Sequence, residues 1–212
     1  MSEVHRAAEI EEKLDGIGDR LREERIKAGI SQRELARRLG LSASMISQLE
    51  SGLSKPSVGT LYAIVTELDL SLDRVIRGED YGVSAQPEAL DGISPLVHPE
   101  QRQSIDLASG VRWEELTAAS EEGIDFLHAT YEVGGASTPD ESLMRHHGRE
   151  YGYVMSGKLG IQIGFSVYEM EPGDSIAFDS TRPHRLYNMG DEPVHAIWFV
   201  AGRDSDDRVA PF

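Results

Sequence analysis

The chain has 212 residues, 39% hydrophobic and 27% charged, which is enough for one large domain or two small domains, each with its own core. It contains no cysteine, which excludes disulfides, thiolate metal sites and cysteine nucleophiles. The first residues, MSEVHRAAEIEEK, are charged, and no apolar run is long enough to span a membrane, so we expect a cytoplasmic protein.

The net charge of −16 is unevenly distributed along the chain. Residues 17–77 carry ten Lys and Arg against eight Asp and Glu, whereas residues 81–212 carry nine against twenty-two. An acidic protein is a poor partner for a polyanion, but the first third alone is not acidic. We therefore expect the two parts of the chain to have different partners.

The first third is predicted to be helical. Its apolar residues recur at helical spacing, in short segments that begin at serines and end at glycines. Ser31 followed by Glu34 predicts a capping box at the start of the second segment. Five helices are predicted: 14–28, 31–39, 42–50, 56–68 and a short one beginning at Ser71.

The segment QRELARRLGLSASMISQLES, residues 32–51, has the spacing of a helix-turn-helix. Ala36 is small where the two helices must cross, Gly40 suits the left-handed turn, and Ile46 provides an aliphatic anchor. Through SQRELA, GLS, ISQLESG and KPSVGTL, residues 14–77 resemble the five-helix, phage-repressor-like helix-turn-helix domain of the XRE family.

This resemblance implies that the second motif helix enters the major groove of double-stranded DNA. Gln48 suits adenine, Ala43 suits a thymine methyl group, and polar residues nearby suit phosphates. The alternative is that these are solvated polar residues of a small helical bundle. Because the local charge is modest, we expect a homodimer on a palindromic operator. The predicted DNA-binding residues are Gln32, Arg33, Ser42, Ala43, Ser44, Ser47, Gln48 and Lys55.

Residues 78–95 are rich in Gly, Pro and acidic residues and predict a linker. Beyond them, short segments rich in β-branched and aromatic residues alternate with turns and predict an all-β domain over 96–202. Residues 1–13 and 203–212 are predicted to be tails. The expected strands are SIDLA, VRWEEL, IDFLHATYEV, EYGYVM, LGIQIGF, SIAFD, HRLYNM and VHAIWFVA.

One stretch of this domain, MRHHGREYGYVMSG, holds two histidines beside a predicted strand. Side chains alternate faces along a strand, so His146 and Glu150 share a face that His147 does not. A later stretch contributes His184 and Asn188, again of equal parity. If the two stretches are neighbours, His146, Glu150 and His184 converge as a two-histidine, one-carboxylate set, which favours Fe(II), with Mn, Ni or Zn as alternatives.

Residues 97–201 also resemble a cupin, a small double-stranded β-barrel built from two sequence motifs. Its first motif begins with two histidines separated by one residue, and here Met144 takes the place of the first, followed by His146 and Glu150. His184 and Asn188 match the second motif. The resemblance implies pairing of two chains through their cupin domains.

Three interpretations of this pocket stay open. In the first, the cupin lacks a metal, and His146 and His184 hydrogen-bond in the pocket or contact an organic effector. In the second, His146, Glu150 and His184 hold a metal that the protein senses. In the third, the domain is an iron-dependent oxygenase, because the pattern also resembles the mononuclear iron epoxidase that acts on hydroxypropylphosphonate. No catalytic residue is predicted. The predicted effector-pocket residues are Met144, Tyr153, His184 and Asn188.

Taken together, the motifs predict a two-domain, sequence-specific transcriptional regulator that is not an enzyme. Its helix-turn-helix domain reads DNA, and its cupin domain senses a small molecule or metal. An effector that prefers one arrangement of the dimer would change operator affinity through its differential binding.

Overall fold

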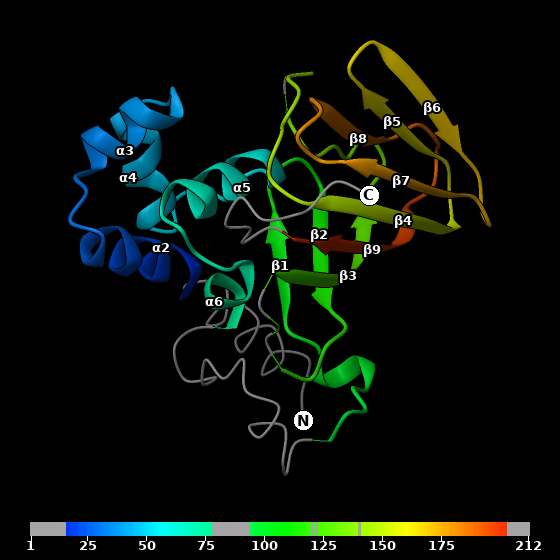
Figure 1. The fold of residues 1–212 in the computed structure, drawn as a ribbon, viewed down its shortest axis with the longest axis horizontal. Coiled ribbons are helices and arrows are strands. Elements are labelled where there is room, and N and C mark those ends of the chain that lie inside the picture. The colour runs from blue at the N-terminus through cyan, green and yellow to red at the C-terminus, as the bar shows by residue number, and fades with distance from the viewer. Residues whose placement is uncertain (1–15, 78–93, 120, 122, 140, 203–212) are drawn as a thin grey trace.

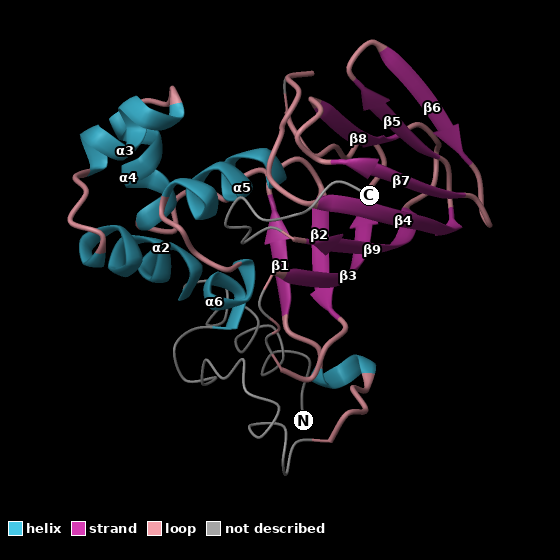
Figure 2. Ribbon diagram, viewed as in Figure 1, coloured by secondary structure: helices cyan, strands magenta, loops and turns pink. Residues whose placement is uncertain are grey.

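The computed structural model describes residues 16–77, 94–119, 121, 123–139 and 141–202 (Figure 1). Apart from one short helix below the strands, helices gather on one side of the molecule and strands on the other, as Figure 2 shows. The two predicted tails and nearly all of the predicted linker lie outside the described residues. Within the described part, no helix is long and apolar enough to cross a membrane.

The N-terminal part is helical, as predicted, and serines begin its helices. Ser31, Ser42 and Ser57 each accept a hydrogen bond from the backbone N–H three residues later, at 3.1 Å. The predicted capping box is half formed, because the Glu34 carboxylate pairs with Arg37 instead. The helices are α2 (Gly16–Lys27), α3 (Gln32–Leu39), α4 (Ala43–Glu50), α5 (Val58–Glu67) and α6 (Leu72–Arg77).

Helices α3 and α4 form the predicted helix-turn-helix. Gly40 ends α3 in the left-handed conformation, with φ of 69°, as the turn requires. A buried ion pair ties α4 to α2: Arg25 Nη2 donates to Glu50 Oε2 at 2.9 Å. The orientation of α4 is therefore fixed by a charged pair as well as by its apolar face, which buries Ile46 and Leu49.

The C-terminal part consists of two sheets and a short 3₁₀ helix, η2 (Pro99–Gln101). The larger sheet has the order β1-β2-β3-β9-β4-β7 and the smaller has the order β6-β5-β8. The strands are β1 (Ser104–Leu107), β2 (Val111–Glu115), β3 (Ile124–Tyr131), β4 (Arg149–Ser156), β5 (Leu159–Ile163), β6 (Ser166–Met170), β7 (Ser175–Asp179), β8 (His184–Asn188) and β9 (Val194–Ala201).

The β region differs from the prediction in two respects. Strand β6 is absent from the predicted strands, because four of its five residues are exposed and it shows no inward and outward alternation. Among the described strands, β6 and β7 end their respective sheets without pairing to each other, so the hydrogen-bonded ladder does not close into the predicted barrel.

The helical part packs directly against the sheets through the N-terminal end of α5 and the loop before it. The N–H of Ala108 donates to the carbonyl of Pro56 at 2.9 Å, and the N–H of Gly59 donates to the carbonyl of Ser137 at 3.1 Å. Across the same junction, Lys55 Nζ lies 3.7 Å from Asp106 Oδ2. The two parts are thus in backbone contact.

Candidate metal centre and nucleic-acid interface

His146, Glu150 and His184 converge inside the cupin region. His146 lies just before β4, Glu150 is the second residue of β4, and His184 begins β8. Glu150 Oε1 lies 2.9 Å from His146 Nε2 and 3.0 Å from His184 Nε2. The ligand atoms of the three side chains lie within 4.8 Å of one another, and all three residues are buried. The three side chains thus converge as expected for two neighbouring stretches.

These three atoms approach closely without forming hydrogen bonds of acceptable geometry. Within the described part of the chain, His146 Nε2, Glu150 Oε1 and His184 Nε2 are buried and lack a hydrogen-bond partner. Ligands about 2.1 Å from a metal and at right angles to each other are separated by about 3.0 Å. The two nitrogen-to-oxygen separations match that value, so the donor set fits a divalent metal.

Neighbouring groups fix the orientation of each ligand. His146 Nδ1 lies 3.0 Å from the carbonyl of His147, and His184 Nδ1 lies 2.8 Å from the carbonyl of Arg182. A carbonyl only accepts, so each Nδ1 carries the proton, and Nε2 of the neutral ring keeps its lone pair for a metal. Trp198 Nε1 donates to Glu150 Oε2 at 2.7 Å, which holds the carboxylate.

The electrostatics of the centre favour a charged carboxylate. Burial opposes ionisation of Glu150, but the two imidazoles, when they are protonated in the metal-free centre, outweigh it and hold its pKa below the usual range. For His184, burial lowers the pKa, whereas the Glu150 carboxylate raises it, with a net rise. Burial, with a smaller contribution from Glu150, also raises the pKa of Tyr131, so this hydroxyl stays neutral.

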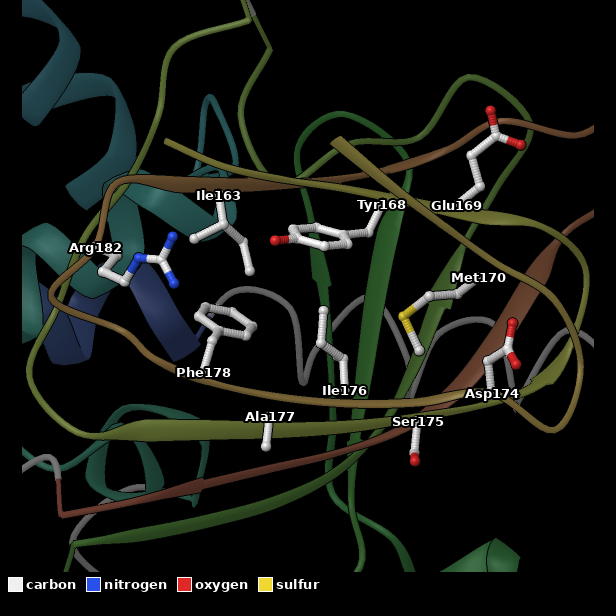
Figure 3. A pocket seen from close by; sticks show the side chains of 10 residues that line it. All are labelled: Ile163, Tyr168, Glu169, Met170, Asp174, Ser175, Ile176, Ala177, Phe178 and Arg182. Atoms are coloured by element: carbon white, nitrogen blue, oxygen red, sulfur yellow. The ribbon is translucent and has the colours of Figure 1, made fainter. Parts of the chain in front are cut away.

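A cavity of about 330 Å³ lies between β6 and β7, where the two sheets do not pair (Figure 3). Its walls include Ile163, Ile176 and Phe178, and the Phe178 ring packs edge-on against His184 at 5.1 Å. In Figure 3, the Arg182 guanidinium and the Tyr168 hydroxyl extend toward Ile163. The cavity thus has apolar walls near Arg182 and Tyr168, the carboxylates of Glu169 and Asp174 on the side away from Arg182, and a wall shared with the candidate metal centre.

The other predicted effector-pocket residues lie elsewhere. Tyr153 is on the outer face of β4, 47% exposed, because it has the parity of Tyr151 rather than of Glu150. Asn188 is buried, but its amide is engaged by backbone groups, including the carbonyls of Tyr131 and Glu192. Met144 is buried beneath α5, and its backbone N–H and carbonyl form hydrogen bonds with those of His184. Only His184 of this predicted set belongs to the candidate centre.

Two residues of the centre's surroundings are missing from the predicted site. Trp198 anchors Glu150, and Tyr62 of α5 stacks on the His146 ring with centroids 4.1 Å apart. A partial signal for Trp198 is present in the sequence: Gly152 lies within a predicted strand, and a glycine there often marks a close approach, which in the structure is that of Trp198 on β9. No comparable signal marks Tyr62.

Seven of the eight predicted DNA-binding residues lie on α3, on α4 or at the N-cap of α4. Ser44, Ser47 and Gln48 of α4 are exposed, and Ala43 is half-buried. At the start of α3, Arg33 is exposed, whereas Gln32 donates to Glu50 Oε2 at 2.8 Å. The Ser42 hydroxyl caps α4. Lys55 is exposed but lies toward Asp106 of the cupin region.

Two family models match the chain: a helix-turn-helix over residues 21–75 and a cupin domain over residues 127–200. The HTH-type transcriptional regulator PuuR of Escherichia coli is 29% identical over 173 residues, covering 81% of this chain and 86% of the relative. The crystal structure of an HTH_3 family transcriptional regulator from Vibrio cholerae has a TM-score of 0.62 at 23% identity, covering 89% of this chain and 96% of that one.

A hydroxypropylphosphonic acid epoxidase from S. wedmorenis covers 89% of this chain and 97% of its own, but at 17% identity and a TM-score of 0.41 it carries no argument about activity. The helical fold, the match of both family models and the homology to regulators over most of their length agree with one another. The chain therefore joins an XRE-type helix-turn-helix domain to a cupin domain, and it is homologous to transcriptional regulators such as PuuR.

Proposed function

We propose that the cupin domain of this regulator senses a divalent metal, held by His146, Glu150 and His184. The observation that carries this proposal is the convergence of three buried donor atoms that lack hydrogen-bond partners within the described part of the chain. Leaving buried polar atoms unpaired is costly, and a cation would satisfy all three at once. When bound, the metal supplies a positive charge to this pocket. The donor set suits Fe, Mn, Ni or Zn.

Elemental analysis of untagged protein, purified without chelator and reconstituted anaerobically, tests this proposal. We expect close to one metal per chain in the wild type and a loss in His184→Ala. The matched control is His147→Ala, because His147 is exposed and lies next to the same centre. Absence of metal in the reconstituted wild type would contradict metal sensing and leave an organic effector as the only input.

An organic effector is a second input, and the cavity between β6 and β7 is its proposed site. Apolar walls and the guanidinium of Arg182 suit a small molecule with an apolar body and an anionic group. Such a molecule would contact Phe178 and, through it, the ring of His184. Arg182→Gln is expected to weaken binding of small organic acids that shift the melting temperature of the wild type.

The DNA-binding surface is proposed to be the exposed face of α4, with Ser44, Ser47 and Gln48 facing base edges and Arg33 facing a phosphate. The exposure of these side chains on the second helix of the motif supports this assignment. Two copies, paired through their cupin domains, would place two such helices on a palindromic operator. We place the regulator in the cytoplasm, where its DNA is accessible.

Pairing is proposed through the outer face of the six-stranded sheet. An aromatic row crosses this face, because Phe199 of β9 pairs in register with Phe126 of β3 on one side and with Tyr151 of β4 on the other. Phe126 is 37% exposed and Tyr151 is 42% exposed. Exposed aromatic rows of this kind are typical of protein interfaces, and a second copy of the same face would cover them.

An iron-dependent oxygenase is the alternative, favoured by the same two histidines and one carboxylate. It requires substrate-dependent oxygen consumption by the Fe(II)-loaded protein. Tight binding to a selected DNA duplex, without oxygen consumption in the presence of small organic acids, would favour the regulator.

A further inference from the structure

We infer that Tyr62 of the DNA-binding domain couples the metal centre to the position of the helix-turn-helix. This inference rests on the function proposed above, because it requires a metal at His146, Glu150 and His184. It adds the route by which occupancy of that centre reaches the DNA-reading helix.

The Tyr62 ring lies within the cupin domain although its helix belongs to the DNA-binding domain. It stacks on His146, with centroids 4.1 Å apart and planes 15° apart, and it meets Trp113 of β2 edge-on at 5.6 Å. Tyr62 is 3% exposed and His146 is 4% exposed. Tyr62 thus covers one face of a candidate metal ligand.

The same end of α5 is fitted closely to the cupin domain. A Cβ placed on Gly59 would lie 2.9 Å from Thr138 Cγ2 and 3.4 Å from Met144 Cβ. Thr138 cannot turn away freely, because its hydroxyl donates to the carbonyl of Ser142 at 2.6 Å. The contact between the domains therefore depends on the absence of a side chain at Gly59.

Docking of α5 and ligation of a metal require the same orientation of the His146 ring. In the docked arrangement, the ring lies flat against Tyr62 while its Nε2 faces Glu150 Oε1. A metal at Nε2 would fix that orientation, and Tyr62 supports the ring from its face. The two events are therefore positively linked, and each raises the equilibrium constant of the other by the same factor.

The path to DNA is short. α5 follows α4 directly in the chain, and the intervening segment, residues 51–57, includes Lys55, which faces Asp106, and Pro56, which bonds to Ala108. Release of α5 would break these contacts and free the reading helix from the cupin domain. Metal occupancy thereby determines whether the two reading helices of a dimer are fixed to their cupin domains or released from them.

Hydrogen exchange measures the docking directly, because Gly59 and Ala108 donate backbone hydrogen bonds across the junction. With each of Fe²⁺, Mn²⁺, Ni²⁺ and Zn²⁺ tested as probe, we expect the metal that binds to slow amide exchange in peptides covering 57–67 and 105–110. Operator affinity should change with metal by a factor of roughly 5 to 150, measured on a duplex selected by the wild-type protein from a random library.

Two independent variants should remove this coupling, and two others should keep it. Tyr62→Leu removes the stacked ring, whereas Tyr62→Phe retains it. Gly59→Ala separates α5 from Thr138 and, because Ala favours helix, does not weaken α5 itself. Adding Thr138→Ser to Gly59→Ala keeps the hydroxyl, removes the obstructing methyl group and should restore both the exchange protection and the metal response.

The outcomes separate the inference from the function on which it rests. Metal binding by the wild type without any change in exchange or operator affinity would overturn the coupling and leave the metal centre standing. Full coupling in both Tyr62→Leu and Gly59→Ala would likewise overturn the role of Tyr62. Failure of the wild type to bind any of the four metals would overturn both.

Discussion

Gly152 shows how one missing side chain determines the geometry of the candidate metal centre. A Cβ at this position would lie 2.0 Å from Trp198 Cζ3, and Trp198 is the residue that donates to Glu150. Gly152→Ala should therefore displace the indole and release the carboxylate. We expect a cost of about 1–3 kcal/mol in urea unfolding, from overpacking, and weaker metal binding by calorimetry. Tyr153→Ala, on the outer face of the same strand, is the control; unchanged metal affinity in Gly152→Ala would contradict this role of Trp198.

Gln48 carries the sharpest prediction for DNA reading. Its side chain is exposed on α4, and an amide can contact adenine through two hydrogen bonds. Gln48→Ala should reduce discrimination between the operator and a single-base variant by about 1–3 kcal/mol, measured by fluorescence anisotropy at fixed salt. Ile26→Ala, an exposed change on α2, should leave discrimination intact. Equal discrimination by Gln48→Ala and the wild type would remove Gln48 from the interface.

At the residue scale, the sequence predicted the grouping of His146, Glu150 and His184 but not the residues that support them. Strand parity selects His146 and Glu150 although the chain bends between them, where Gly148 has φ of 103°. Backbone pairing with Ser180 on both sides of that bend keeps His146 beside β4. The role of Trp198 depends on the register of β4 against β9, which is fixed by long-range pairing. Tyr62 has the periodicity of an ordinary core residue, so its contact with another domain leaves no local pattern.

Between elements, the buried pair of Arg25 and Glu50 makes the attachment of α4 to α2 sensitive to acid. Burial alone would raise the Glu50 pKa, but the bonds from Arg25 and Gln32 lower it on balance. A carboxylate with a lowered folded-state pKa stabilises above its unfolded value of about 4.3, and this contribution is lost as pH falls through the folded pKa. Stability of the helical domain should thus fall below about pH 4.3.

Glu50→Gln tests that expectation, because it leaves Arg25 buried without its counter-ion. We expect roughly 3 kcal/mol of destabilisation at pH 7 and a flatter dependence of stability on pH in the acid range, followed by urea unfolding with circular dichroism. Glu67→Gln, which loses a more exposed ion pair with Arg38, should change little. Wild-type stability that is constant down to pH 3 would contradict the assignment.

The elements themselves were predictable to different degrees. Serine caps and glycine stops locate the helices, because both act within a few residues. Strand β6 has no buried face to create a period of two, and the pairing of strands into separate sheets depends on contacts far apart in the chain. Local rules therefore placed the helices but not the open edge between β6 and β7.

For the whole molecule, the outer aromatic row predicts that pairing of two copies controls DNA affinity. Tyr151→Arg would place like charges near each other in a symmetric interface, and we expect a monomer in sedimentation equilibrium. Operator affinity should then fall by a factor of about 10²–10⁴. In a dimer, binding of the first reading helix holds the second at a high effective concentration near its half-site, and a monomer loses this advantage. Val167→Arg, exposed on β6 of the smaller sheet, is the control. A dimeric Tyr151→Arg protein would place the interface elsewhere.

The cavity proposed for an effector lies apart from the DNA-binding domain. All its lining residues lie between Ile163 and Arg182, so no part of its wall comes from the DNA-binding domain. From Phe178 a continuous line of rings runs through His184 and His146 to Tyr62, on the other side of the metal centre. If the cavity binds a solute as proposed, that solute could enter and leave while the reading helices stay on DNA. The regulator would then track solute concentration in real time, at a pace set by solute exchange rather than by how long it remains on its operator.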